Sequence, residues 1–400
     1  MTAALRKLPR PDDRVLAALA IAAGIALPFL FGSGSPFIHD AILALSYMMM
    51  ALGLNVIVGF AGLLDLGYVA FFAIGAYTMG WLGSNFFSGA GGGEGFHLLV
   101  GSPAAEMPGI HVNFLIVIVV AVIFTTIAGI LIGLPTLRLR GDYIAIVTLA
   151  FGEIIGRIAI NGDQIKIGPI WDATLGRLPL LPELGAEATL TRGKQGITPV
   201  DKIDLPLLDP FTSLDLRAWY LIALALVLVV LFVNLRLRDS RLGRAWVALR
   251  EDEVAASSMG IPLVKTKLLA YGTGAAFGGV SGALLGSYLN TVSADQFQFS
   301  FSIFILAMVI LGGLGSIWGV VVGAILLSFV NTWLIPDVLN GVPGQLGLDF
   351  DLTQLSYAIF GFLLVIVMVL RPEGLIPERR RKLELHGLGA GDTAGAGTDV

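Results

Sequence analysis

Residues 267–290 read KLLAYGTGAAFGGVSGALLGSYLN, an apolar stretch with a glycine at every fourth position from Gly274 through Gly278 and Gly282 to Gly286. Residues four apart lie on one face of an α-helix, so this spacing predicts a helix with a smooth face on which a neighbouring helix can pack closely. The stretch is also long enough to cross about 30 Å of hydrocarbon. It therefore predicts a helix within a membrane bundle.

The composition places the rest of the chain in a membrane as well. Of 400 residues, 56% are hydrophobic and only 14% are charged, and the mean hydropathy is +0.85. A soluble domain of this length needs a charged exterior that this chain does not have. The formal net charge of −4 says little about partners. The absence of cysteine from the sequence excludes disulfides, thiol catalysis and cysteine metal sites.

Apolar runs recur along the chain and predict an all-α integral membrane protein, a polytopic helical bundle of about ten transmembrane spans. We expect the spans near residues 15–32, 41–60, 66–84, 113–135, 143–160, 218–235, 267–290, 300–312, 316–335 and 354–370. The run 300–312 is too short to cross alone at about 1.5 Å per residue, so it can form a broken or re-entrant pair with 316–335. The predicted count is therefore eight to ten.

The positive charges predict the topology. Most of the 25 lysines and arginines fall in residues 1–14, around 138–140, in 236–267 and in 371–382, and cytoplasmic segments retain such residues. We expect a cytoplasmic N-terminus (1–14), a transmembrane domain (15–375) with a long external loop (161–217) and a cytoplasmic segment (236–267), and a disordered cytoplasmic tail (376–400). Ten spans with both termini inside also have the parity of a 5+5 inverted repeat.

The sequence contains few groups that could do chemistry. It has no GxxxxGK[ST] phosphate loop and no HExxH motif, so we expect no ATP hydrolysis, no metal site and no cofactor on this chain. Glu153 and Arg157 are four apart on one predicted span, where they can pair and offset each other's burial as a structural charged pair. A proton- or sodium-coupled carrier needs more ionisable groups at mid-membrane, so their scarcity argues against self-powered transport.

The segment 236–267 has the pattern of an amphipathic helix followed by an acidic cluster. Leu242, Ala245, Trp246 and Leu249 repeat at helical spacing and form an apolar stripe. One interpretation is a helix lying on lipid headgroups, which basic residues favour. The acidic run 251–253 fits an anionic surface poorly and a protein pocket better, so we favour a docking element.

Several stretches resemble the branched-chain amino acid ABC permeases, and the LivM type in particular. They are RAWVALREDEVAASSMG (244–260), GLNVIVGFAGLLDLGY (53–68) with the following 71–77, TLAFGEII (148–155), LGGLGS (311–316) and RPEGL (371–375). Together they cover most of the chain between about 45 and 375. Departures follow Glu153, where Arg157 is shifted and a TGG-type turn is missing, and the loop 161–217 looks expanded.

The resemblance implies a complex in the bacterial inner membrane. This chain would pair with a second, LivH-type permease above two ATPase subunits that carry the ATP and magnesium, and a periplasmic binding protein would deliver the substrate. Nucleic acid has no part in it. The resemblance carries over six contact candidates for the ATPase: Arg250, Glu251, Asp252, Glu253, Ala256 and Gly260.

We therefore expect a permease subunit, not an enzyme, that moves branched-chain or other hydrophobic amino acids. Alternatives are an ABC permease for urea, amides or other amino acids, and a self-sufficient carrier or channel. The candidates for lining the translocation path are Tyr68, Phe71, Phe72, Gly59, Gly62, Gly312 and Gly313, although tight helix packing is the favoured interpretation of the glycines.

Overall fold

The computed structural model describes residues 21–101, 107–137, 139, 141–174, 176, 182–204, 211, 215–340, 355–371 and 373–376. The α-helices are α2 (Pro36–Leu54), α3 (Val69–Leu82), α4 (Phe114–Thr136), α5 (Asp142–Asn161), α6 (Gly168–Thr174), α7 (Leu216–Asp239), α8 (Arg241–Glu251), α9 (Glu253–Ser258), α10 (Leu263–Tyr288), α11 (Phe299–Gly312), α12 (Ile317–Phe329) and α14 (Ser356–Leu370). Wider π-helical turns extend α2 over Asn55–Phe60 and α12 over Val330–Leu339. Short 3₁₀ turns occupy Leu27–Phe29, Asn85–Phe87, Ala90–Gly93, Gly162–Gln164, Gly193–Gln195 and Ala294–Phe297.

Nine apolar helices match nine of the ten predicted spans. Six are long and apolar enough to cross a membrane, and three shorter ones lie at Val69–Leu82, Phe299–Gly312 and Ala358–Val367. The prediction of a polytopic helical membrane protein is confirmed. The first predicted span lies only partly within the described residues, where 21–29 are helical. Residues 1–14 and all but the first residue of the predicted tail lie outside them.

A small sheet in the loop after α3 was not predicted. It consists of β1 (Gly83–Ser84), β2 (Phe96–Leu98) and β3 (Ile110–Val112), in the order β1-β3-β2. β3 pairs antiparallel with β1 and parallel with β2. Strands of two and three residues are too short for an alternating pattern to stand out in a sequence, which is why the loop reads as featureless.

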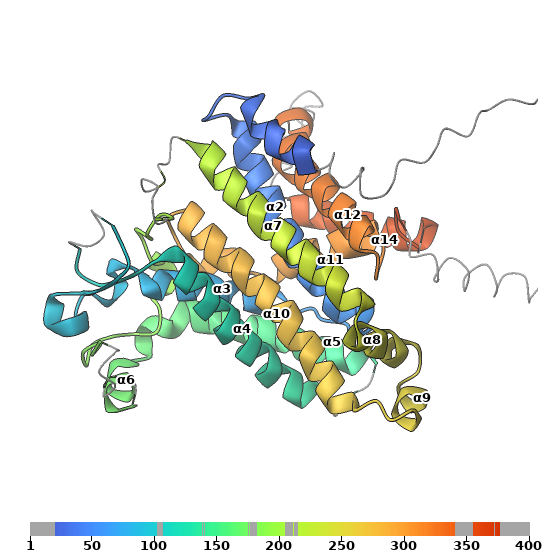
Figure 1. The fold of residues 1–400 in the computed structure, drawn as a ribbon, viewed down its shortest axis with the longest axis horizontal. Helices are drawn as coiled ribbons and strands as arrows, with labels where there is room; N and C mark the ends of the chain where they lie inside the picture. The colour runs from blue at the N-terminus through green and yellow to red at the C-terminus, as the bar shows by residue number, and fades with distance from the viewer. Residues whose placement is uncertain are drawn as a thin grey trace, which may run out of the picture.

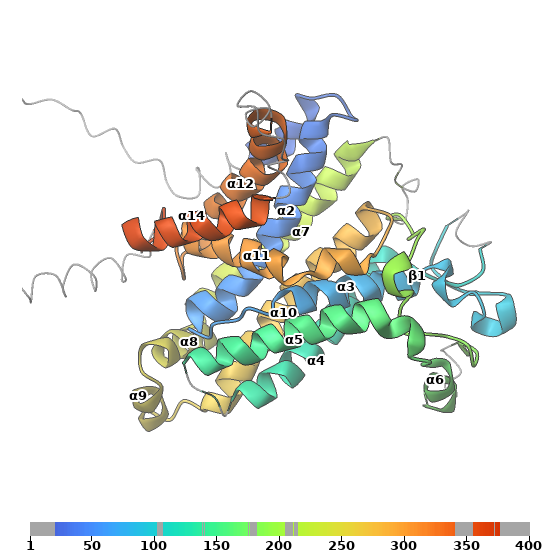
Figure 2. The same cartoon turned by 180° about the vertical axis from the view of Figure 1, so that it is seen from behind.

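The helices form two interlocked sets. The long helix α10 packs against α3 and α4 of the first half, while α2 packs against α11 and α12 of the second half. Figure 2 shows α3 and α4 beside α10, with α5 against α3 and α4, and α11 and α12 beside α2, with α14 against α11. Each half thus supplies one long helix to the other half, as in a pair of repeats that exchange their first buried helix.

The two exchanged helices run in opposite directions. Nδ1 of His39, at the start of α2, lies 2.6 Å from the hydroxyl of Tyr288 at the end of α10. About two helical turns further along both helices, the hydroxyl of Ser281 donates to the carbonyl of Ser46 at 2.8 Å. The second helices of the two sets, α2 and α10, must run antiparallel in a 5+5 inverted repeat.

The glycine ladder of α10 packs against α2 and α3. The carbonyl oxygen of Gly53 lies 2.8 Å from the position that a Cβ on Gly274 would take, and Cβ of Phe71 lies 3.1 Å from the corresponding position on Gly278. The backbone of α3 fits against the two remaining glycines of the ladder, Gly282 and Gly286. The ladder is therefore a bundle interface, as its spacing predicts.

The two ends of the bundle differ in character. Figure 1 shows α8 and α9 at one end of the long helices, and α6 with the strands and loops at the opposite end. We call the end with α8 and α9 the coupling end, after the role toward an ATPase that the family resemblance predicts for it, and the opposite end the loop end.

Candidate functional site

Helix α8 is fixed to the bundle by its apolar stripe. Trp246 is fully buried and its indole N–H donates to the carbonyl of Thr266 in α10 at 2.9 Å. Leu249 is buried in the same face. Asp252 lies in extended conformation where α8 ends and α9 begins. The prediction of an amphipathic helix is confirmed, and its apolar face packs on protein.

Arg250 ties α8 to the turn after α2. Its Nη1 donates to the carbonyl of Gly59 at 2.6 Å. The Arg250 side chain also covers Gly62, whose φ of +69° and lack of a Cβ leave room for it. Nearby, the amide N–H of Gly315 donates to Oδ1 of Asn55 at 2.9 Å, which joins the π-helical end of α2 to the turn between α11 and α12. The coupling end is thus a network that reaches both halves of the fold.

The acidic cluster shapes α9 instead of lying free. Oδ1 of Asp252 accepts hydrogen bonds from the N–H groups of Val254 and Ala255 at 2.8 and 3.0 Å, so Asp252 is the N-cap of α9. Glu253 accepts from Nζ of Lys267 at 2.7 Å, an ion pair in which the lysine side chain is only 4% exposed. The cluster therefore fixes α9 relative to the base of α10.

The far side of α9 is an exposed tip. Val254 is 67% exposed and Met259 is 84% exposed, whereas Ala256 is buried against the chain itself. The chain leaves α9 through Gly260, whose φ of +84° disfavours any side chain, and the N–H of Ile261 reaches back to the carbonyl of Ala256 at 3.1 Å. The structure brings all six predicted coupling residues together at one end, and their role toward an ATPase stays a prediction.

The predicted path residues lie in the packed interior. Tyr68 is fully buried and its hydroxyl donates to the carbonyl of Gly274 at 2.7 Å. Phe71 and Phe72 are also buried, and the ring of Phe72 meets that of Phe297 at a centroid distance of 5.7 Å. Of the predicted glycines, Gly59, Gly312 and Gly313 each lie close to the backbone of another segment. Close packing accounts for these glycines, and a path role for any of the seven stays a prediction.

Glu153 and Arg157 lie on an exposed face of α5. Among the ion pairs of the described residues, none joins these two side chains. An exposed pair four residues apart gains only a few tenths of a kcal/mol, which is too little to hold two long side chains together. Both residues instead line a cleft of about 360 Å³ between α5 and the segment leading into α11.

We call this space the α5 cleft. Its polar lining is Glu153, Arg157, Asp295, Gln298 and Ser300, and its apolar lining includes Ile160, Ala294, Phe297 and Phe299. One wall therefore belongs to each half of the fold.

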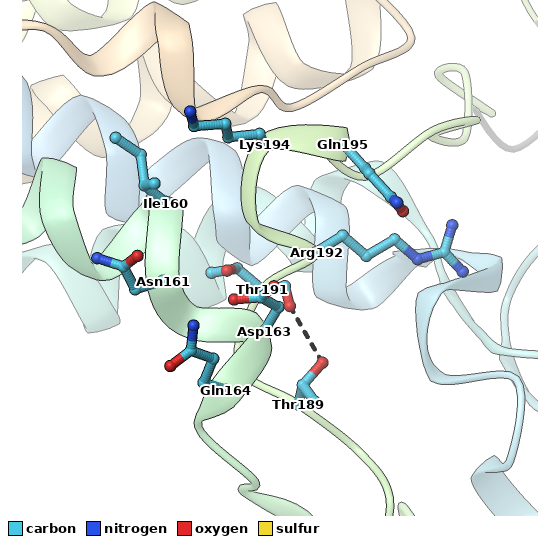
Figure 3. A pocket seen from close by; sticks show the side chains of 9 residues that line it. All are labelled: Ile160, Asn161, Asp163, Gln164, Thr189, Thr191, Arg192, Lys194 and Gln195. Atoms are coloured by element: carbon cyan, nitrogen blue, oxygen red, sulfur yellow. Dashed lines mark hydrogen bonds between the residues drawn. The ribbon is translucent and has the colours of Figure 1, made fainter.

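A second polar cavity, the outer pocket, continues from the α5 cleft toward the loop end. It has a volume of about 500 Å³ and is lined by Ile160, Asn161, Asp163, Gln164, Thr189, Thr191, Arg192, Lys194 and Gln195. In Figure 3 the side chains at the end of α5 lie opposite the loop that carries Thr189 and Thr191, where the hydroxyl of Thr189 donates to the carbonyl of Thr191 at 3.0 Å. Ile160 lines both spaces, so they adjoin.

The sequence analysis missed most of this polar surface. Glu153, Arg157, Asn161 and Gln164 follow each other at helical spacing and form one stripe on α5. That spacing was visible in the sequence, but the stripe extends past the predicted span end into the loop. Asp295 has no local signal, because the other charged residues that line the cleft, Glu153 and Arg157, lie on a distant segment of the chain. Within the described ranges, no group of three or more His, Asp or Glu side chains could hold a metal ion.

Comparisons with known proteins agree with the architecture. The family model described as "Branched-chain amino acid transport system / permease component" matches residues 37–368. The high-affinity branched-chain amino acid transport system permease protein LivM of Escherichia coli is 38% identical over 95% of this chain and 78% of its own length. The LivM of Salmonella typhimurium is 37% identical over 93% of this chain and 76% of its own length.

A more distant similarity is to the LivH type of permease protein. The permease protein LivH of Salmonella typhimurium is 28% identical over 41% of this chain and 48% of its own length. No solved structure matches the chain significantly. From the family match and the two LivM similarities, we conclude that this chain belongs to the permease-component family of branched-chain amino acid transport systems.

Proposed function

We propose that this chain is the LivM-type permease subunit of an ATP-driven importer for branched-chain amino acids. It pairs in the membrane with a LivH-type permease above two ATPase subunits, the coupling end sits in a groove of the ATPase, and a periplasmic binding protein delivers substrate at the loop end. ATP and magnesium belong to the ATPases, and this chain performs no bond chemistry.

The observation that carries this proposal is the construction of the coupling end. An exposed tip, Val254 and Met259, is joined to buried anchors on both sides through Trp246, Arg250 and Lys267. A segment that only rested on lipid headgroups would not need hydrogen bonds into two transmembrane segments. Such a segment is suited to receive a movement from outside the membrane and pass it to α2 and α10.

The same assignment fixes orientation. The coupling end faces the cytoplasm because the ATPases bind there, and its basic residues agree with this side. The N- and C-termini are then cytoplasmic, and the membrane is the bacterial inner membrane.

The test is reconstitution of this chain with its second permease and ATPases in proteoliposomes, with the binding protein added outside. We expect uptake of leucine, isoleucine and valine that requires ATP and all subunits. ATP-driven uptake of urea or amides in place of these amino acids would move the chain to a different substrate class. Uptake by this chain alone, without an ATPase, would contradict the proposal and identify a self-sufficient carrier.

A further inference from the structure

The α5 cleft combines opposite charges with an apolar wall. Glu153 and Arg157 on α5 line it together with Asp295 on the opposite side, and none of the three side chains is buried within this chain. Among the hydrogen bonds and ion pairs of the described residues, none engages the carboxylates or the guanidinium of these three. The cleft therefore presents both positive and negative side chains to a bound solute.

These charges are in the wrong place for a lipid-facing surface. They lie on Tyr143–Gln164, one of the six helices suited to cross a membrane. A charged side chain at the centre of such a helix costs about 2.5 to 3.5 kcal/mol on insertion scales when lipid surrounds it. The exposed face of α5 is apolar at Tyr143 and Ile146 and becomes charged only from Glu153 onward. The charged half is therefore suited to face water or solute.

We propose that the α5 cleft is a binding site for the zwitterionic head of an apolar α-amino acid during transport, an inference that rests on the proposed function. Arg157 binds the carboxylate of the solute. Its planar guanidinium matches the geometry of a carboxylate better than the ammonium group of a lysine does. Glu153 and Asp295 receive the ammonium group.

The wall formed by Ile160 and Phe297 accepts the side chain of the solute. Ile160 lines the cleft and Phe297 lies at its back, buried against Phe72. At about 360 Å³ the space falls within the range of small-molecule sites, which is roughly 300 to 1,000 Å³. Because Ile160 also lines the outer pocket, a solute released at the loop end has a polar route into the cleft.

Because the sequence contains no cysteine, the test can use a single introduced cysteine as a reporter. Ser300→Cys places a thiol in the cleft of the assembled complex in nanodiscs. Its labelling by a charged methanethiosulfonate reagent is followed by mass spectrometry of this chain. Ile160→Cys, on the opposite wall, repeats the measurement should Ser300→Cys not assemble. Glu187→Cys, in an exposed loop and outside the lining of both cavities, is the control that leucine should not affect.

We expect saturating leucine to slow labelling of the cleft cysteine. 3-Methylbutylamine, which lacks the carboxylate, and 4-methylpentanoate, which lacks the ammonium, should each require at least about tenfold higher concentration, because each loses a charge-assisted hydrogen bond. Arg157→Gln should remove the preference for leucine over 3-methylbutylamine. The double variant Glu153→Gln, Asp295→Asn should remove the preference for leucine over 4-methylpentanoate. Lys166→Gln, an exposed loop lysine that pairs with Glu187, should leave protection intact.

Two results would overturn the assignment. One is unchanged labelling in a complex whose ATP-driven leucine uptake is intact. The other is undiminished protection by leucine in Arg157→Gln. Loss of the proposed function has a different signature, since the wild-type complex would then show no ATP-driven uptake of branched-chain amino acids at all.

Discussion

Gly53 and Gly274 meet where α2 crosses α10, and the contact is reciprocal. The carbonyl oxygen of each glycine lies 2.8 Å from the position that a Cβ on the other would occupy. The hydroxyl of Tyr68 reaches into the same crossing and donates to the carbonyl of Gly274. A contact that is the same from both sides is what a pseudo-twofold axis between two inverted halves produces where it passes through the structure.

We expect Gly274→Ala to destabilise the bundle. A methyl group there would lie 2.5 Å from Cγ1 of Ile57 and 2.8 Å from a backbone oxygen that cannot move independently, and overpacking of this kind costs about 1 to 3 kcal/mol. Gly361→Ala in α14 is the matched control, because nothing lies within 4 Å of its Cβ position. The measurement is the melting temperature and the monodisperse yield in detergent. Equal behaviour of the two variants would show that the crossing is not a packing constraint.

The loop end should respond to pH through His111. Burial lowers the pKa of this histidine, but its hydrogen bond and charge interaction with Asp201, at 2.7 Å, outweigh that effect and raise the pKa above the usual 6.5. A raised pKa in the folded state means that the pair stabilises the fold fully below about pH 6.5 and loses this contribution as pH rises through the raised value. The link joins β3 to the loop that precedes α7.

Thermal unfolding of the purified chain between pH 5.5 and 8.5 measures this contribution. The melting temperature should fall toward the alkaline end of the range, and Asp201→Asn should flatten that fall because the neutral amide no longer favours the imidazolium. A slope that is the same in wild type and Asp201→Asn would place the pH response elsewhere.

The apolar runs predicted the spans, and the four-residue spacing of the glycines predicted the packing face of α10, because each of these patterns lies within a single helix. The apolar stripe of α8 was predictable for the same reason, and Trp246 and Leu249 are buried as the stripe requires. Contacts between distant segments could not be predicted in this way. The bond from Arg250 to Gly59 joins residues 191 positions apart, and nothing local in either segment indicates it.

The charged pair of α5 illustrates the same limit. Spacing placed Glu153 and Arg157 on one face, and on that ground they were expected to satisfy each other. What this face contacts depends on Asp295 and Gln298, which belong to the other half of the chain and line a cleft together with Glu153 and Arg157. Whether two neighbouring charges pair or face a cavity is decided by the tertiary structure.

Two substitutions of Asp252, to alanine and to serine, test the role of the acidic cluster. Asp252→Ala removes the acceptor for two backbone N–H groups, which should cost about 0.5 to 2 kcal/mol and let the start of α9 fray. Asp252→Ser keeps a cap and serves as the control. We expect the alanine variant to co-purify less ATPase than the serine variant, with equal insertion into the membrane.

Replacing Glu251, Asp252 and Glu253 together should abolish transport, because it removes both the cap and the ion pair with Lys267. Unchanged co-purification of the ATPases with the triple variant would show that the acidic cluster has no part in docking.

Arg250 tests transmission separately from docking. Its guanidinium bonds within this chain, to Gly59, so Arg250→Ala should leave the exposed tip of α9 in place while it removes a charge-assisted hydrogen bond worth about 1.5 to 3 kcal/mol. We therefore expect ATPase association and ATP hydrolysis to persist while leucine uptake per ATP falls, because a movement of α9 no longer reaches the end of α2. Arg250→Lys keeps the charge without the planar geometry and should fall between the two. Parallel loss of ATPase binding and uptake in Arg250→Ala would mean that this arginine contacts the ATPase directly, as the family resemblance alone suggests. Equal coupling in Arg250→Ala and wild type would show that the force passes instead through Trp246 and α10.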